Sequence, residues 1–383
     1  MLKSLYIENL FGLYSYHLPF DADGTSSIKF ITAPNGYGKT TILNIIYSFY
    51  GEDFVALSKI LFDKLSFEFS DGYKVKVYQK RIIPEVDIDN DIPQPVQVDM
   101  GIVMYGADKV LLLKKNFTIG ETIPPMVSLH VYLSSNQRHY FRDNRLWSTS
   151  DKSEISKMVN SVLHVLMKLQ GRLTRFFADA LLSPTAGISK EDYYERMGKL
   201  ASSLRILRLC HVLGTLDAGT YNENSKEYLN SVVSALENVC EGERLLIDKL
   251  KTFFDIINGA EFSHKQIQLS PSFGFRFIAD NSDHTILTVD DLSSGEKQIL
   301  IQTIGLLFEA DDDSLVLIDE PELSFHMAWQ AQFFENLKAI AKLKKIQCII
   351  STHSPMIFQN HWNMANDLFD ISTPSKYKPC QNL

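Results

Sequence analysis

The sequence predicts an α/β protein that combines an antiparallel β subdomain with an inserted helical, coiled-coil-like module. Hydrophobic residues alternate with polar ones through much of the first third, recur at helical spacing in the middle, and mark alternating helices and strands toward the end. From these changes of pattern we expect one α/β lobe in two halves, 1–139 and 263–383, with the helical insertion at 140–262.

The composition of the 383-residue chain is that of a globular protein, with 45% hydrophobic and 22% charged residues, which excludes a disordered or fibrous chain. Its formal net charge of −8 argues against a surface that binds a polyanion throughout, and a local basic patch stays open. The four cysteines form no CxxC pair, the N-terminus has no leader-like pattern, and the apolar runs are too short for a bilayer. We therefore expect a cytoplasmic protein with reduced thiols and no membrane segment.

The first third of the chain is predicted to consist of strands and one early helix. Strands flank a turn at Gly12, and a helix with an apolar face covers 41–50. A β-hairpin at 61–81 turns at Asp71-Gly72. A surface loop and three further strands are expected at 84–99, 101–105, 109–113 and 127–133.

Helical spacing begins near residue 150. Helices are expected at about 150–176, 190–213 and 225–257, and the segment 151–260 holds 14 basic and 14 acidic residues, so it is neutral. Strands return within 266–290. The final elements alternate between helix and strand, at 294–309, 314–318, 326–343 and 346–350.

A glycine-rich loop lies between the third strand and the first helix. Glycines allow several backbone N–H groups to face one phosphate, and the helix N-terminus adds its dipole. Lys39 is placed to reach the β- and γ-phosphates of a nucleotide, and the Thr40 hydroxyl to bind Mg²⁺. The first position of the loop pattern is Ala33 in place of glycine, which is tolerated if its φ is negative. The candidate nucleotide-binding residues are Asn35, Gly36, Tyr37, Gly38, Lys39, Thr40 and Thr41.

A short apolar strand near 314–318 ends in two carboxylates. In open α/β sheets, ligands bind at the carboxyl ends of the strands. Asp319 is therefore placed to hold Mg²⁺, and Glu320 to polarise an attacking water molecule. A strand that simply ends in acidic residues is the alternative, and the phosphate-binding loop earlier in the chain argues against it.

Two further motifs flank this acidic strand in the sequence. The segment 292–298 opens a helix with Ser293, Ser294, Gly295 and Glu296, which alone would be an ordinary helix cap. A second buried strand ends in Ser351-Thr352-His353-Ser354. Alone, His353 would more often be structural, and at its distance from Asp319 it fits a sensor of the γ-phosphate.

The four motifs, in this order, resemble those of the ABC-type ATPases. Leu292–Gln298 is similar to their signature motif, Leu315–Glu322 to their Walker B strand, and Ile349–Ser354 to their switch-histidine strand. The resemblance implies ATP and Mg²⁺ as cofactors and at least a homodimer, in which Ser293 and the residues after it face the γ-phosphate bound by the partner. It also implies a glutamine that contacts Mg²⁺ and water. Gln137 is the favoured candidate for this role, and Gln79 is the rival.

The spacing of the motifs and their flanking residues resemble the SMC, RecF and OLD-like subgroup. Lys39 and Ser293 lie 254 positions apart, much further than in a transporter ATPase subunit. Leu5–Gly12 and Glu320–His326 are similar to the subgroup's first strand and its Walker B continuation. Because about 30 residues follow His353, we expect no Toprim nuclease domain. The remaining resemblance is to the stand-alone AAA/OLD-like ATPases of Septu, PARIS and retron anti-phage systems, which work with a separate effector such as a nuclease or toxin.

Three functions compete at this point: a regulatory ATPase in anti-phage defence, a RecF/SMC-like DNA-repair ATPase, and a transporter ATPase subunit. The long insertion argues against the transporter, and the negative net charge weakens the repair ATPase. The basic residues of 152–175 form the candidate nucleic-acid face, although a solvated helix face is the more ordinary explanation of them. We expect the helical module to bind a partner protein or to support a higher oligomer.

Overall fold

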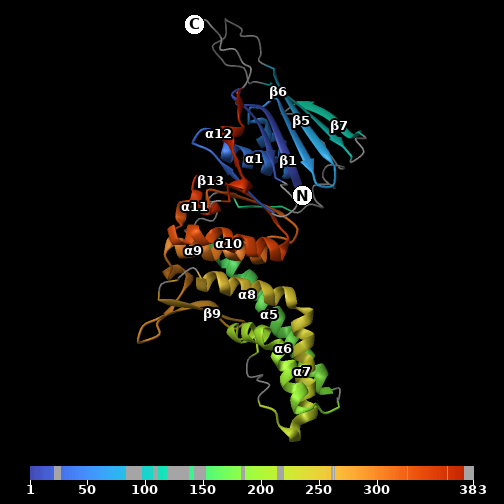
Figure 1. Ribbon diagram of the computed structural model, residues 1–383, viewed down its shortest axis with the longest axis vertical. Coiled ribbons are helices and arrows are strands. Elements are labelled where there is room, and N and C mark those ends of the chain that lie inside the picture. Colours follow the sequence, from blue (N-terminus) through green and yellow to red (C-terminus); the bar gives the residue numbers. More distant parts are fainter. Residues whose placement is uncertain are drawn as a thin grey trace. The chain divides into compact units, whose positions relative to one another are not determined.

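The computed structural model divides the chain into two compact units, Met1–Leu146 with Ala310–Leu383 and Trp147–Glu309 (Figure 1). Within them the structure describes residues 1–20, 27–82, 97–106, 111–118, 138–141, 152–182, 186–213, 220–259, 262, 264–325, 327–359 and 361–374. The first unit is discontinuous in sequence, because the second unit is inserted between its two parts.

A parallel five-stranded sheet forms one layer of the first unit. Its strand order is β14 (Ala365–Asp367), β3 (Ile28–Thr32), β13 (Gln347–Thr352), β12 (Leu315–Asp319) and β8 (Arg138–Phe141). Every residue of β3, β12 and β13 is buried, as expected for a parallel sheet covered on both faces. The strand at the centre, β13, pairs in parallel with both β3 and β12. These three strands therefore deliver their carboxyl ends to the same edge of the sheet.

An antiparallel seven-stranded sheet forms a second layer of this unit. Its order is β15 (Thr373–Pro374), β2 (Tyr14–Pro19), β1 (Leu2–Leu10), β4 (Lys64–Phe69), β5 (Lys74–Ile82), β6 (Gln97–Tyr105) and β7 (Leu111–Thr118). The predicted hairpin is confirmed as β4 and β5, with Gly72 in the turn at a φ of 86°. Strand β6 begins within the expected loop 84–99, and residues 84–96 and the expected strand 127–133 lie outside the described residues.

Helix α1 (Lys39–Tyr50) packs in the core that both sheets share. Its apolar side chains Ile42, Ile46 and Phe49 are fully buried, and the Phe49 ring stacks on Phe67 of β4 with 3.8 Å between ring centroids. The other helical segments of this unit are α2 (Phe54–Ser58), η4 (Pro321–Ser324), α10 (Met327–Lys344), α11 (Pro355–Phe358), η5 (Trp362–Met364) and α12 (Leu368–Ile371).

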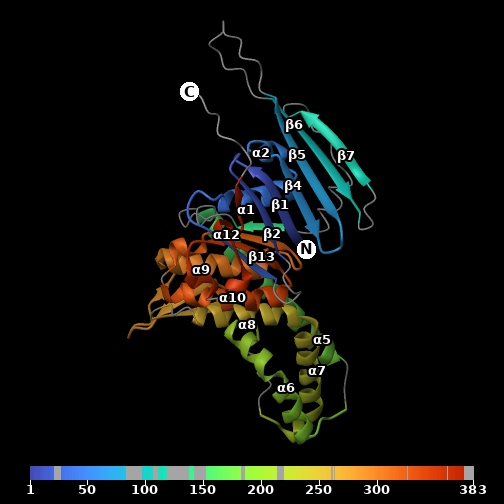
Figure 2. The same ribbon diagram turned by 45° about the horizontal axis from the view of Figure 1, so that its top comes forward.

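The second unit contains long helices and a small sheet (Figure 2). Its helices are α5 (Lys152–Leu182), α6 (Lys190–Leu209), α7 (Lys226–Gly242), α8 (Arg244–Gly259) and α9 (Ser294–Ile304), with the short turns η1 (Glu223–Ser225), η2 (Val289–Asp291) and η3 (Gly305–Glu309). Strands β9 (Lys265–Ser270), β10 (Gly274–Ala279) and β11 (Ile286–Leu287) form an antiparallel sheet. None of the helices in the described parts of the chain is long and apolar enough to cross a membrane.

The helix expected over 225–257 is in fact two helices that meet at Glu243. The carboxylate of Glu243 lies 3.5 Å from Lys168 Nζ and 3.3 Å from Arg172 Nε, both on α5, which packs along α7. These ion pairs also engage two of the basic side chains of the candidate nucleic-acid face.

Candidate functional site

The phosphate-binding loop follows β3 directly and leads into α1. Gly36 and Gly38 have φ values of 91° and 85°, in the left-handed region that favours glycine. A Cβ atom at position 38 would lie 3.2 Å from Leu10 Cδ2, so the Leu10 side chain would have to move slightly for any larger residue there. Ala33 is not among the residues with positive φ, and this explains why alanine fits the first position.

Aromatic side chains support Tyr37 at the tip of this loop. Its ring stacks on Tyr14 at 5.2 Å and meets Phe369 edge-on at 5.8 Å. The Tyr16 hydroxyl donates a hydrogen bond of 2.9 Å to the Tyr37 carbonyl, and burial raises the pKa of Tyr16, which keeps this donor protonated. No sequence motif indicated Tyr14, Tyr16 or Phe369, and their common aromatic character is the one signal that they carry.

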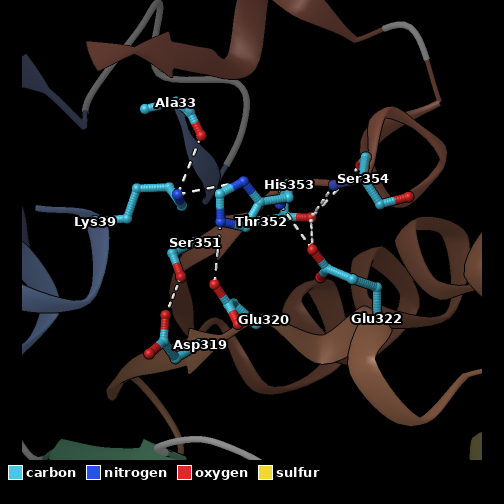
Figure 3. A network of polar contacts seen from close by, with 9 residues as sticks. All are labelled: Ala33, Lys39, Asp319, Glu320, Glu322, Ser351, Thr352, His353 and Ser354. Atoms are coloured by element: carbon cyan, nitrogen blue, oxygen red, sulfur yellow. Dashed lines mark hydrogen bonds and ion pairs between the residues drawn. The ribbon is translucent and has the colours of Figure 1, made fainter. Parts of the chain in front are cut away.

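Strand β12 delivers the two predicted carboxylates. Asp319 is the last residue of the strand, is 6% exposed, and accepts a hydrogen bond from the Ser351 hydroxyl of β13 (Figure 3). Glu320 has a φ of 47°, which is unusual for a residue other than glycine, and its N–H donates to the Ser351 carbonyl at 3.0 Å. This turn of the backbone directs the Glu320 side chain away from the strand and toward His353.

The imidazole of His353 joins the loop to the acidic strand (Figure 3). Its Nδ1 lies 3.4 Å from Lys39 Nζ, and its Nε2 lies 3.2 Å from Glu320 Oε1. An ammonium group can only donate, so we assign Nδ1 as the acceptor and the proton of the neutral ring to Nε2. The structure thus brings together three residues that the sequence predicted, of which Lys39 and His353 lie 314 positions apart in the chain.

The ammonium group of Lys39 is enclosed at the base of this arrangement. The side chain is 6% exposed, and its Nζ donates to the Ala33 carbonyl at 3.0 Å. Burial lowers the pKa of Lys39, and the nearby carboxylates Glu320, Asp319, Glu322 and Asp367 oppose this effect. A phosphate group would supply a further anion to this buried cation, so the electrostatics suit a nucleotide.

The donor set for a divalent cation is incomplete without a ligand. Among the described residues, no group of three or more His, Cys, Asp or Glu side chains could hold a metal ion. Mg²⁺ in nucleotide sites is bound by one or two carboxylates together with phosphate oxygens and water. Thr40, at the start of α1, and Asp319 fit that mode of binding, with the nucleotide supplying the remaining oxygens.

The two candidate glutamines differ in what the structure says of them. Gln137 lies outside the described residues. Gln79 is buried in β5, where its Oε1 accepts from Phe62 N–H at 3.2 Å and its Nε2 donates to the Ser58 carbonyl at 2.9 Å. Both ends of the Gln79 amide therefore hold the neighbouring loop, which is a structural use of this side chain.

The predicted signature segment belongs to the second unit and begins α9. Ser293 is the N-cap: its Oγ accepts from Glu296 N–H at 3.3 Å, while its own N–H donates to Glu296 Oε2 at 2.8 Å. Lys265 of β9, which no sequence motif indicated, donates to both oxygens of Glu296 at 2.8 and 2.9 Å. Burial tends to raise the pKa of Glu296, but the Lys265 and Ser293 hydrogen bonds outweigh it and lower that pKa. Ser294 and Gly295 are the first two residues of the helix.

Comparison with known proteins supports an AAA-type ATPase domain in this chain. The family described as "AAA domain, putative AbiEii toxin, Type IV TA system" matches residues 202–358, which include the signature segment, Asp319, Glu320 and His353. The retron Ec83 probable ATPase of Escherichia coli is 31% identical over 121 residues, covering 27% of this chain and 21% of that protein. Protein ea59 of Escherichia phage lambda is 31% identical over 94 residues, covering 24% of this chain and 17% of that protein. The chain thus matches about a fifth of the length of these two relatives.

Solved SMC head domains are also similar to the chain. The Smc head of Pyrococcus furiosus with an extended coiled coil, bound to the C-terminal domain of ScpA, aligns with a TM-score of 0.42 and 14% identity, over 94% of this chain and 91% of that one. The SMC head domain from Thermotoga maritima aligns with a TM-score of 0.36 and 12% identity, over 98% of this chain and 99% of that one.

Proposed function

We propose that this protein binds ATP with Mg²⁺ and hydrolyses it to ADP and phosphate. The contact of His353 with both Lys39 and Glu320 carries the proposal, because it gathers a phosphate-binding cation, a carboxylate and a polar sensor at one edge of the sheet. Phosphoryl transfer needs mainly such positioning and charge stabilisation, with little covalent chemistry from the protein.

Each part of the site has a role in the proposed reaction. The loop from Asn35 to Thr41 binds the phosphates, with Lys39 neutralising the β- and γ-phosphate charge. Thr40 and Asp319 would hold Mg²⁺, which would shield the phosphate charge, and Gln137 is the further candidate contact to the ion and the water. Glu320 accepts the proton of the attacking water. His353, released from Lys39 by the incoming nucleotide, contacts the γ-phosphate.

Hydrolysis by the purified chain tests this proposal most directly. We expect phosphate release with Mg²⁺ and ATP, its loss on chelation of Mg²⁺, and a decrease of about tenfold or more in kcat for His353→Asn. His17→Asn, at an exposed position of β2, is the matched control and should hydrolyse ATP at the wild-type rate. Full activity of the His353 variant would remove the histidine from the proposed mechanism.

The signature segment supports a second proposal, that two or more chains assemble around ATP. In the ABC-type arrangement that the motifs resemble, Ser293, Ser294, Gly295 and Glu296 of one chain face the nucleotide held by the loop of its partner. Light scattering of Glu320→Gln with and without ATP tests this assembly. We expect a dimer or higher oligomer with ATP, and its loss when Ser293→Arg is added to place a bulky cation at the start of α9.

We further propose that the ATPase regulates a separate effector, a nuclease or a toxin, in anti-phage defence. The matching family is described by a toxin of a type IV TA system and one relative is a retron ATPase, and these likenesses motivate the role. Co-purification with the product of a neighbouring reading frame, with ATP or ADP, tests it. Deleting 150–258 with a short linker then asks whether the helices capture the effector. A variant that folds, hydrolyses ATP and still captures the effector would exclude them as the docking site.

The alternative is a RecF/SMC-like DNA-repair ATPase, and a transporter subunit is less favoured. Repair requires a nucleic-acid surface, but Lys168 and Arg172 of the candidate face are already paired with Glu243. Binding of duplex DNA whose affinity falls steeply with salt, and falls further in Lys168→Glu, would favour repair over defence.

A further inference from the structure

Glu322, two residues after the proposed catalytic carboxylate, has a contact pattern that the proposed mechanism does not use. It lies in the 3₁₀ turn η4, and its side chain points toward the end of β13 (Figure 3). Its Oε1 accepts hydrogen bonds from the backbone N–H of His353 at 2.7 Å and from the Thr352 hydroxyl at 2.8 Å. One carboxylate oxygen thus holds both the histidine's own peptide group and the residue before it.

The segment held by Glu322 is itself organised by hydrogen bonds. Thr352 is fully buried, and its hydroxyl accepts the N–H of Ser354 at 3.0 Å while it donates to Glu322. The Ser354 hydroxyl donates to Gln330 Oε1 at 2.7 Å, and Gln330 Nε2 donates to the Phe325 carbonyl at 3.2 Å. Two links therefore connect the turn after β12 to the turn after β13, and His353 lies between their attachment points.

The contacts of the two Glu322 oxygens allow the effect of its hydrogen bonds to be separated from the effect of its charge. Oε2 is buried and has no hydrogen-bond partner among the described residues. The contacts to Thr352 and His353 thus use one oxygen only, and the side-chain carbonyl of a glutamine offers the same acceptor. The Glu322 charge also acts on Lys39 at longer range, and that effect is absent in a glutamine variant.

We propose that Glu322 is a positioning residue that fixes the His353 backbone, so that in the absence of nucleotide the imidazole spans from Lys39 to Glu320. A ring whose nitrogens lie 3.4 Å from one group and 3.2 Å from the other loses one contact when it shifts by an ångström toward the other group. This inference rests on the proposed ATP hydrolysis for its kinetic consequence, while its structural consequence holds without nucleotide.

The test compares Glu322→Ala with Glu322→Gln in the full chain. We expect kcat for ATP to fall about tenfold to a hundredfold in the alanine variant, because misplaced reacting groups cost rates of that order. The glutamine variant should stay within about threefold of wild type, and the Kd for ATP should stay within about threefold in both. Thr352→Val, which removes only the hydroxyl, should give a smaller loss in kcat and covers the case in which the alanine variant does not fold. Glu68→Ala, which loses ion pairs to Lys3 and Lys74 on the antiparallel sheet, is the control for loss of a carboxylate elsewhere in the same unit.

A second readout needs no nucleotide. In protein labelled with ¹⁵N-histidine, His353→Asn identifies the His353 ring signals, which should report the Nε2–H tautomer in wild type. We expect these signals to change in Glu322→Ala and to persist in Glu322→Gln. Wild-type signals and wild-type kcat in the alanine variant would overturn the inference, as would a glutamine variant as defective as the alanine variant in both readouts. If wild type does not hydrolyse ATP, the proposed function fails, and the ring signals alone decide the role of Glu322.

Discussion

The N-termini of α1 and α9 are both predicted to face phosphate, yet they are capped in different ways. Helix α1 begins after Gly38, with no side-chain hydrogen bond to cap it. Helix α9 begins after Ser293, and a reciprocal pair of hydrogen bonds with Glu296 caps it. A glycine cap leaves the backbone N–H groups to an incoming anion, whereas the serine cap supplies an anion from the helix's own first turn.

The difference indicates how each segment would meet a nucleotide. The loop before α1 is shaped by glycines around an enclosed lysine and needs no rearrangement of a capping side chain. At α9 the Glu296 carboxylate, held by Lys265, already neutralises the positive end of the helix. The N-terminus of α1 is therefore suited to tight phosphate binding. The N-terminus of α9 is suited to a weaker contact, which depends on how firmly its serine cap is held.

Removing Lys39 at the N-terminus of α1 should have the largest effect, which is a loss of ATP binding. We expect Lys39→Ala to weaken ATP binding about a hundredfold or more, since a buried charge-assisted contact to phosphate is lost. Titration calorimetry with ATP measures this, with Lys59→Ala, an exposed lysine of the same unit, as the control. Unchanged affinity in Lys39→Ala would contradict the assignment of the loop.

Changing Glu320, which lies near the N-terminus of α1, should separate ATP binding from ATP turnover. We expect Glu320→Gln to bind ATP as wild type does, but to hydrolyse it about a hundredfold more slowly, because an amide is a poor base. Single-turnover measurement of phosphate release gives the rate, and equilibrium binding gives the affinity. Glu335→Gln, whose partner is the exposed Lys338 on α10, is a control that should leave turnover intact. A wild-type rate in Glu320→Gln would point to another base.

Removing Lys265, which pairs with Glu296 at the N-terminus of α9, should lower the free energy of unfolding. Lys265→Met leaves the buried carboxylate of Glu296 without its partner, and we expect a loss of about 1–3 kcal/mol in the free energy of unfolding. Adding Glu296→Gln should recover part of that loss, because the uncompensated charge is then removed. Urea unfolding of both single variants and the double variant yields the coupling energy. Additive losses in the double variant would show that the pair is not coupled.

The smallest expected effect is a pH dependence of the stability that Glu296 contributes at the N-terminus of α9. The pKa of Glu296 is lowered in the folded protein, so the unfolded chain binds the proton more readily. Its contribution to stability is complete above the ordinary carboxyl pKa of about 4.5 and is lost as the pH falls through the folded value. Between about pH 7 and about pH 4, the Lys265→Met/Glu296→Gln variant should therefore lose less stability than wild type. Melting temperatures measured across this pH range check the prediction, and an equal fall in the melting temperatures of the two proteins would contradict it.

The sequence was informative where burial is strong and local. Alternation in Leu65, Phe67, Val75 and Val77 predicted the hairpin, because each of these side chains faces one core. The break at Glu243 was missed, since apolar spacing continues across it and the partners of its carboxylate lie on another helix. At the site, motif order predicted Lys39, Glu320 and His353, whereas the links through Thr352, Ser354 and Gln330 depend on tertiary contacts that no local pattern encodes.

The discontinuity of the first unit has a consequence for synthesis on the ribosome. The phosphate-binding loop is translated early, but Ile28 of β3 pairs with Cys348 of β13, and the Gln347 side chain exchanges two hydrogen bonds with the backbone of Leu2. The nascent chain must therefore hold an unfinished sheet while all of Trp147–Glu309 emerges. Because contacts between distant residues form slowly, this interval exposes strand edges to mispairing or to chaperones. The strands that carry Asp319 and lead to His353 are translated only after Trp147–Glu309, so a nascent chain gains its loop well before it gains its proposed catalytic groups.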